Sequence, residues 1–207
     1  MRMGLITFLS RWLGSKPADG DKPRIQPFFD DEIGARYVNP LFYRDGMGRP
    51  ALVVVDMQTG FLCQDGSVDE LIDPAWQAIL DEVEALVLEA VARGWKVFLL
   101  EYEGYGTTFW QITRHLEGYP LACRLTKNKW DGSTQVVSLN ERCGGSSEYL
   151  VCGCYAEQCV EQTVVSLAKS QPRSLVRVAR QACLPHDAGY EWSRFPTASN
   201  LQLDRAA

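Results

Sequence analysis

Hydrophobic and polar positions between residues 51 and 180 alternate between short apolar runs and longer amphipathic segments. Residues 51–55 form a continuous aliphatic, largely β-branched run, which is typical of a parallel strand covered on both faces. Residues 73–94 open with Asp-Pro, carry apolar side chains at helical spacing and end at a glycine, which predicts a helix. The same criteria place further strands at residues 95–100, 121–126, 148–152 and 174–179, and further helices at residues 107–117, 134–142 and 159–170.

This alternation predicts an α/β fold, a three-layer, doubly wound and mainly parallel sheet with helices on both faces. Numbered along the chain, the strands are expected in the order 3-2-1-4-5, to which a sixth strand can be added. The pattern defines a domain at residues 50–185. The periodicity fades after Pro185, so we expect residues 186–207 to form a C-terminal tail.

Residues 1–49 are expected to form an N-terminal arm that is partly helical and partly extended, because chain breakers are frequent at residues 15–49. An apolar helical face near the start consists of Leu5, Phe8, Leu9, Trp12 and Leu13. This face can pack on the domain or on a sister subunit, contact a membrane interface, or belong to a leader. The segment is too short and too polar to span a bilayer, so we expect no stable membrane insertion. The preferred interpretation is a homodimer or larger homo-oligomer.

Composition narrows the class of protein further. A chain of 207 residues with 46% hydrophobic residues can bury one sizeable core without disulfide bonds. The formal net charge of -5 argues against nucleic acid as a partner. Seven cysteines is an odd number, and their spacing does not resemble a secreted disulfide framework. We therefore expect a cytoplasmic protein in a reducing environment.

Three reactive residues occupy equivalent places in the alternation. Asp56 follows the first strand, Lys127 follows the third and Cys159 follows the fourth. Because ligands of open parallel sheets bind outside the carboxyl ends of the strands, we expect these side chains to gather at one edge of the sheet. Each also has an ordinary interpretation, as a turn residue, a surface charge or a packed thiol, and Lys129 competes with Lys127.

Cys159 stands where a strand, a glycine and a short turn lead into a helix. A helix start favours a thiolate, so its pKa is expected to lie below the free value of about 8.5. An aspartate can accept the thiol proton, and a lysine favours both anions. Cys152, Cys154 and Cys159 could instead bind zinc, but no second ligand pair follows them.

Three motifs carry a family resemblance. ALVVVDMQTGFL, LTKNKWDGS and VCGCYAEQCVEQT resemble, in order and spacing, the aspartate, lysine and cysteine motifs of isochorismatase-like cysteine hydrolases, over residues 51–180. The resemblance implies hydrolysis of a small amide through a cysteine thioester, with Asp56, Lys127 and Cys159 as the catalytic group. It also implies a cis peptide bond before Tyr155, and an oxyanion hole formed by the N–H groups of Tyr155 and Cys159.

The chain departs from the nicotinamidase branch of that family after the second strand. Nicotinamidases carry an Asp-x-His metal motif there, whereas residues 100–108 contain no histidine. Glu101 and Glu103 could bind a hard cation, but two carboxylates alone more often face solvent. We therefore expect metal-independent chemistry and no cofactor. Aromatic residues that could line a substrate pocket are Phe61, Tyr102, Tyr105, Phe109, Trp130 and Tyr155. An inactive binding or assembly module, and a vinyl ether hydrolase of the isochorismatase type, remain as alternatives.

Overall fold

The strand that begins at Ala51 lies at the centre of a seven-stranded sheet with the order β1-β4-β3-β2-β5-β6-β7. The computed structural model describes residues 35–36, 38–61 and 74–204, so the apolar face at residues 5–13 and the expected cap Asp73 lie outside the described residues. The strands are β1 (Ala35–Arg36), β2 (Ala51–Val55), β3 (Lys96–Tyr102), β4 (Ala122–Lys127), β5 (Glu148–Cys154), β6 (Leu175–Leu184) and β7 (Leu201–Leu203).

The predicted strand order is confirmed. Strands β2 to β6 pair in parallel in the order 3-2-1-4-5, and β7 adds the sixth parallel strand beside β6. This sixth strand lies within residues 186–207, where the sequence indicates only a tail. A further strand, β1, pairs antiparallel with β4 at the opposite edge. Strands of two and three residues are too short to produce a readable alternation of polar and apolar positions.

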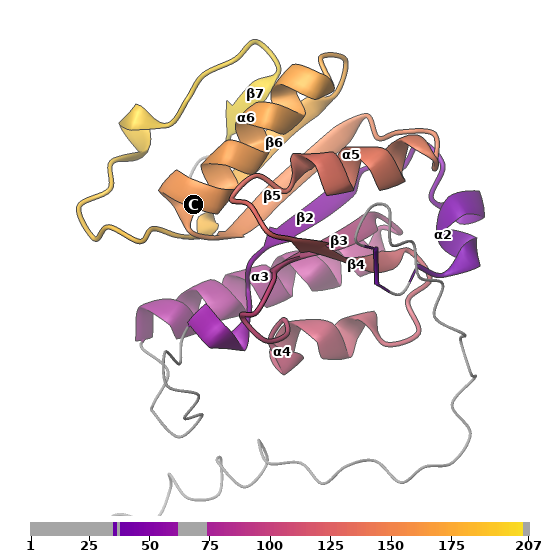
Figure 1. Cartoon of the computed structure of the whole chain (residues 1–207), viewed down its shortest axis with the longest axis horizontal. Coiled ribbons are helices and arrows are strands. Elements are labelled where there is room, and N and C mark those ends of the chain that lie inside the picture. Colours follow the sequence, from indigo (N-terminus) through magenta and orange to yellow (C-terminus); the bar gives the residue numbers. More distant parts are fainter. Residues whose placement is uncertain (1–34, 37, 62–73, 205–207) are drawn as a thin grey trace, which may run out of the picture.

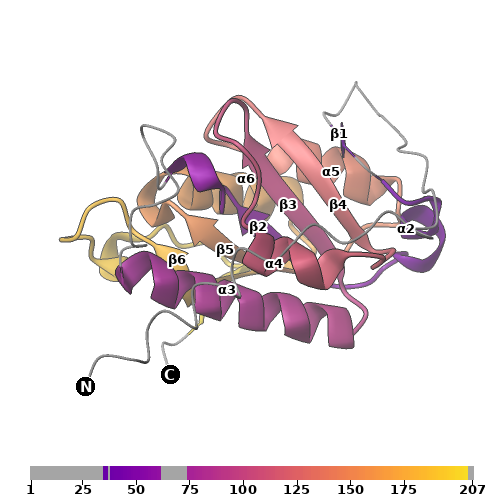
Figure 2. The ribbon, with the colours of Figure 1, turned by 90° about the horizontal axis from the view of Figure 1, so that it is seen from below.

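Helices cover both faces of the sheet, as predicted (Figures 1 and 2). α3 and α4 lie on one face, and α5 and α6 lie on the other. The longest, α3, packs a stripe of buried residues against the strands: Trp76, Leu80, Val83, Val87 and Ala90. The helices are α2 (Pro40–Asp45), α3 (Pro74–Ala92), α4 (Trp110–Thr113), α5 (Ser133–Glu141) and α6 (Glu161–Ser170), with shorter turns η1 (Thr59–Phe61), η2 (Arg114–Leu116), η3 (Ala156–Val160) and η4 (Trp192–Arg194). None of the helices in the described ranges is both long and apolar enough to cross a bilayer.

The last part of the expected arm belongs to the core. The Asn39 side chain accepts a hydrogen bond from Leu41 N at 2.9 Å and caps α2. Phe42 on this helix is fully buried, and its ring packs edge-on against Phe98 of β3 at 5.5 Å between centroids. Residues 38–45 therefore pack on the domain rather than serving only as an extended lead-in.

Two helices differ from the sequence prediction. The helix expected at residues 107–117 is divided into α4 and η2. The helix expected from Cys159 begins three residues earlier as the π-helical turn η3, which continues into α6. A π-helical turn is invisible to a search for 3.6-residue periodicity, and such turns are frequent at functional sites.

Gly153 brings the ends of β2 and β5 together. It lies opposite Val55 with φ +123°, and a Cβ atom at this position would lie 2.0 Å from the Val55 carbonyl oxygen. Only glycine permits this approach. The close contact places the residue after Val55, Asp56, beside the end of β5.

Candidate active site

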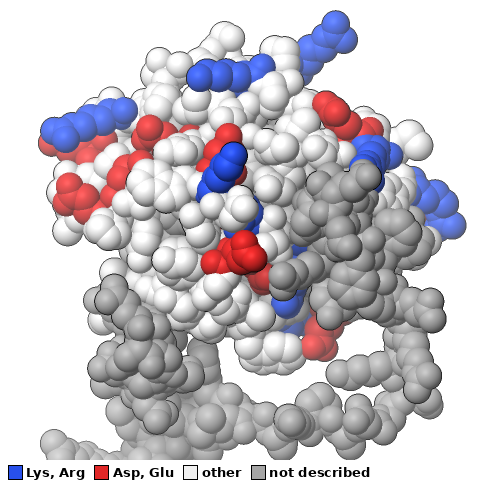
Figure 3. All heavy atoms as spheres, viewed as in Figure 1, with Lys and Arg blue, Asp and Glu red and all other residues white. Residues whose placement is uncertain are grey.

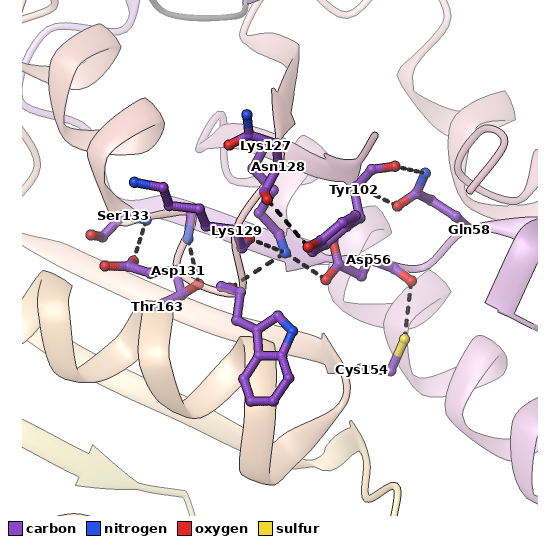
Figure 4. Close-up of polar contacts among 12 residues, drawn as sticks. Asp56, Gln58, Tyr102, Lys127, Asn128, Lys129, Asp131, Ser133, Cys154 and Thr163 are labelled. Atoms are coloured by element: carbon purple, nitrogen blue, oxygen red, sulfur yellow. Dashed lines mark hydrogen bonds and ion pairs between the residues drawn. The ribbon is translucent and has the colours of Figure 1, made fainter. Parts of the chain in front are cut away.

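Asp56 and Lys127 form a buried ion pair at the carboxyl edge of the sheet. Asp56 follows β2 with φ 52°, a strained conformation for a residue other than glycine. Lys127 ends β4, and its Nζ lies 2.7 Å from Asp56 Oδ2 (Figure 4). Both side chains are fully inaccessible to solvent. The sequence prediction that these two residues converge agrees with this geometry.

The ammonium of Lys127 has further partners that hold it in place. It donates to the main-chain oxygens of Lys129 at 3.1 Å and Trp130 at 3.4 Å, and lies 4.5 Å from the centre of the Tyr102 ring. The Lys129 side chain is exposed. Lys127, and not Lys129, is therefore the lysine that meets Asp56.

Cys159 completes the group. It is the fourth residue of η3 and is 5% exposed, and its thiol interacts with both Asp56 and Lys127. Asp56 Oδ2 is taken by Lys127, whereas the buried Oδ1 accepts no hydrogen bond within standard geometry from the described residues. Oδ1 is therefore the oxygen available to receive the thiol proton. One turn beyond Cys159, Thr163 Oγ1 accepts a bond from Gly132 N at 3.0 Å, which ties α6 to the loop after Lys127.

Burial dominates the electrostatics of the group. It raises the pKa of Asp56 to about 6, against the opposing effects of the Lys127 charge and of the nearby polar groups of Lys127, Cys159 and the Tyr102 main chain. Burial, followed by the negative charge of Asp56, raises the pKa of Cys159 to about 12. The expected pKa below 8.5 is therefore wrong for the ligand-free protein, because desolvation and the carboxylate outweigh Lys127. The resting group is a thiol beside an ionised carboxylate.

The main chain around Cys154 agrees with the resemblance. The peptide bond between Cys154 and Tyr155 is cis, as expected, and Cys154 Sγ donates to Asp56 O at 3.0 Å. Tyr155 precedes η3, and its carbonyl oxygen accepts bonds from Gln158 N and Val160 N, both at 3.1 Å. The N–H groups of Tyr155 and Cys159 thus belong to the same tight turn. Their role as an oxyanion hole stays a prediction.

Most of the predicted pocket residues come together beside this group. Phe61 stacks on Tyr105 at 4.4 Å and meets Tyr155 edge-on at 5.8 Å. Tyr102 meets Tyr105 edge-on at 5.4 Å. These four rings form an aromatic cluster. The other two predicted residues lie outside it.

Phe109 and Trp130 are these two residues. Phe109 is buried and packs against Trp76, which in turn contacts Tyr155, so it joins the core behind the aromatic cluster. The Trp130 side chain is 49% exposed, and this residue reaches the site through its carbonyl oxygen, 3.4 Å from Lys127 Nζ. Lining of the pocket by these two side chains stays a prediction.

Glu101, one of the two glutamates considered as cation ligands, is already committed to other groups. Glu101 Oε1 accepts hydrogen bonds from Thr108 N at 2.9 Å and Thr108 Oγ1 at 2.8 Å, and lies 3.8 Å from Arg124. Its carboxylate therefore fastens the loop after β3. Within the described ranges, no three His, Cys, Asp or Glu side chains are grouped so that they could hold a metal ion. The donors present do not fit the metal site of nicotinamidases.

The described surface has two further features. Basic and acidic side chains of described residues are interspersed on the face shown in Figure 3. A hollow of about 390 Å³ involves neither Asp56, Lys127 nor Cys159. It is lined by Val38, Asn39, Leu99, Thr113, Leu116, Glu117, Gly118, Tyr119, Ala122, Cys123 and Arg124. We therefore do not place the reaction there.

Sequence reasoning missed two residues near the site. Gln58 is completely buried and binds the main chain of Tyr102 through both ends of its amide. Its position two residues after Asp56 was the available signal. The His186 ring packs edge-on against Tyr155 at 4.9 Å, although the residue lies beyond the last strand visible in the sequence. Glu157 accepts hydrogen bonds from His186 N at 3.1 Å and Asp187 N at 2.7 Å and fixes this loop.

Comparison with known proteins gives a family and a fold. The isochorismatase domain family matches residues 50–184. Nicotinamidase from Bacillus subtilis superposes with a TM-score of 0.61 and 16% identity, over 76% of this chain and 99% of that chain.

Two further solved structures are similar. Nicotinamidase from Staphylococcus aureus has a TM-score of 0.57 and 19% identity, over 69% of this chain and 88% of that chain. N-carbamoylsarcosine amidase from Thermoplasma acidophilum has a TM-score of 0.59 and 16% identity, over 76% of this chain and 96% of that chain. At these identities the similarities establish the fold. A comparison with curated protein sequences found no match.

Proposed function

The chain belongs to the isochorismatase family of hydrolases, and from this premise we propose that it hydrolyses a small amide through the thiol of Cys159. The observation that carries the proposal is the buried Asp56–Lys127 pair, 2.7 Å across, whose charges act on that thiol. A carboxylate with one free oxygen, a fixed cation and a thiol are the parts that nucleophilic catalysis requires. Similarity to two nicotinamidases and a carbamoylsarcosine amidase supports an amide as substrate.

In the first half of the proposed reaction, Asp56 Oδ1 takes the thiol proton while Sγ attacks the amide carbonyl carbon. A pKa of about 6 leaves Asp56 ionised at neutral pH and therefore able to act as a base. The N–H groups of Tyr155 and Cys159 would stabilise the oxyanion. Asp56 then gives the proton to the amide nitrogen and the C–N bond breaks. Ammonia or an amine departs, and the acyl group stays bound to Sγ as a thioester.

In the second half, Asp56 takes a proton from a water molecule that attacks the thioester carbonyl. The C–S bond breaks, the carboxylic acid leaves, and the proton on Asp56 returns to the thiolate. Lys127 holds Asp56 in place and offsets its charge as the thiolate forms. The proposal routes no step through a metal, because Glu101 is committed to Thr108.

The decisive experiment measures ammonia release from a panel of small amides by the wild type, Cys159→Ala and Asp56→Asn. We expect kcat/KM of each variant to fall on the order of 10⁴-fold or more. When catalytic residues act as a unit, loss of one removes most of the effect of all. Circular dichroism should confirm that both variants fold. Turnover by Cys159→Ala close to wild type would rule out the nucleophile. Absence of turnover, with Cys159 alkylated no faster than the other cysteines, would instead indicate a binding or assembly module.

We propose further that residues 50–185 carry catalysis and that the arm at residues 1–49 contributes to a homodimer or larger oligomer. The apolar face at residues 5–13 supports assembly. The cysteines of the described residues are all free thiols, which supports a reducing, cytoplasmic location. Light scattering of the full chain tests the assembly, and a monomer at micromolar concentration would contradict it.

A further inference from the structure

Tyr102, the last residue of β3, lies against the ammonium of the Asp56–Lys127 pair (Figure 4). Its ring centre lies 4.5 Å from Lys127 Nζ. The negative face of an aromatic ring stabilises a cation. We infer that Tyr102 is a positioning residue that keeps Asp56 and Lys127 ionised and in contact. This inference rests on the proposed function.

Gln58 fixes the main chain of Tyr102 on both sides. Tyr102 N donates to Gln58 Oε1 at 2.6 Å, and Gln58 Nε2 donates to Tyr102 O at 3.0 Å. The same Nε2 donates to Gly106 O at 2.8 Å, so the amide also ties down the loop that follows β3. Gln58 is completely buried, so its amide end of each bond is shielded from water. The Tyr102 backbone therefore cannot move away from the ion pair without breaking its hydrogen bonds to a buried amide.

The far end of the Tyr102 side chain is fixed as well. Its hydroxyl donates to Asn128 O at 3.2 Å, directly after Lys127. Tyr102 and Lys127 are register partners in the sheet, and Glu103 N donates to Lys127 O at 2.8 Å. The ring is thus held across the end of β4, where it covers one side of the ammonium. The remaining sides face Asp56 and the carbonyl oxygens of Lys129 and Trp130.

Tyr105, in the loop that follows β3, provides a matched control. It is 42% exposed, stacks on Phe61 and meets the Tyr102 ring edge-on, but no contact of its own ring with the ion pair is described. Removal of the Tyr105 ring should therefore change substrate binding in the predicted pocket. Removal of the Tyr102 ring should change the chemical step.

The experiment compares Tyr102→Leu, Tyr102→Phe and Tyr105→Leu. We expect Tyr102→Leu to lower kcat between about three- and thirty-fold, the range of cation–π contacts from exposed to desolvated, and to change KM less than Tyr105→Leu does. The pH at which kcat/KM falls on the acid side should rise, because a less firmly held ammonium lowers the pKa of Asp56 less. Tyr102→Phe keeps the ring and should restore both quantities. Tyr105→Leu should raise KM and leave the acid limb in place.

A second readout needs no substrate. The rate of alkylation of Cys159 by iodoacetamide, followed by mass spectrometry of its peptide, should fall several-fold in Tyr102→Leu but not in Tyr102→Phe, because Lys127 favours the thiolate. Equal rates in the Leu and Phe variants would overturn the inference. A protein that turns over no amide but shows this difference would overturn the proposed hydrolase and support the inference about Tyr102.

Discussion

Two lysines in the described part of the chain are almost fully buried, and they lie at opposite ends of neighbouring strands. Lys96 opens β3 and Lys127 ends β4. Lys127 meets the Asp56 carboxylate, whereas Lys96 donates to Gly145 O at 2.6 Å and to the side-chain oxygen of Asn140. Among the described residues, Lys96 has no carboxylate partner.

The difference shows what a carboxylate adds to a buried cation. The neutral oxygens that bind Lys96 offset only part of the cost of burying its charge, so burial lowers the pKa of Lys96 to about 8. This lysine fastens the loop after α5 to the start of β3, which is a structural role. At the other end of the sheet, the carboxylate keeps one oxygen free beside a thiol. A buried lysine therefore indicates chemistry here only where an acid and a nucleophile accompany it.

Replacement of each lysine by methionine should give the largest contrast. Lys127→Met removes the charge that holds Asp56 and offsets the thiolate, so we expect kcat/KM to fall on the order of 10²–10³-fold. Lys96→Met lies at the far end of the sheet and should retain activity within a few-fold of wild type. Steady-state kinetics on the amide found by screening measures both. Equal losses in the two variants would remove the functional distinction between the lysines.

The pH dependence of kcat/KM on its acidic side should also distinguish Lys127 from Lys96. Asp56 must be ionised to act as base, so kcat/KM of the wild type should rise with pH through about 6. The Lys127 charge lowers the pKa of Asp56, so the residual activity of Lys127→Met should show its limb roughly one pH unit or more higher. Lys96→Met should keep the wild-type limb. A limb that does not move in Lys127→Met would show that the titrating group is not Asp56.

Stability at alkaline pH should report on Lys96. In the unfolded chain this lysine has the ordinary pKa of 10.5, whereas in the folded protein its pKa is about 8. Between these values the unfolded chain binds more protons, so this residue makes the free energy of unfolding rise with pH. The rise in wild type relative to Lys96→Met should be roughly 2 kcal/mol between pH 8 and 10.5. Urea unfolding at several pH values measures it, and parallel curves for the two proteins would contradict the assignment.

The smallest effect is expected at Lys129, two residues from Lys127. Its side chain is exposed, and only its carbonyl oxygen contacts the site. Lys129→Ala keeps that carbonyl and should therefore change kcat/KM less than about two-fold, as is usual for an exposed surface charge. The same assay suffices. A loss comparable to that of Lys127→Met would exchange the roles of the two lysines.

The meeting of Asp56 and Lys127 could be predicted from sequence because each follows a parallel strand. A parallel sheet brings all its carboxyl ends to one edge, so residues 71 positions apart in the chain form a contact. The same logic placed Cys159 nearby. The resemblance then distinguished Lys127 from Lys129, which periodicity alone could not do.

What the sequence could not indicate depends on burial and on loop geometry. The thiol pKa of Cys159 was expected to be low from its helix start, but its burial and the nearby Asp56 charge raise it. The bonds from Gln58 to Tyr102 depend on the shape of the loop after β3. His186 reaches Tyr155 by a turn after β6 that has no periodic signal. Short or irregular segments carry too few residues to reveal a pattern.

The two outermost strands, of two and three residues, have a consequence for colloidal behaviour. An exposed strand edge can pair with a strand of another chain. Short edge strands leave few main-chain groups free for such pairing. On one side, Arg177 binds both carboxylate oxygens of Asp204 and also Glu148, which fastens the end of β7 to β6. Removal of residues from Leu201 onward would bare the longer strand β6, whose main chain would then be open to edge-to-edge aggregation.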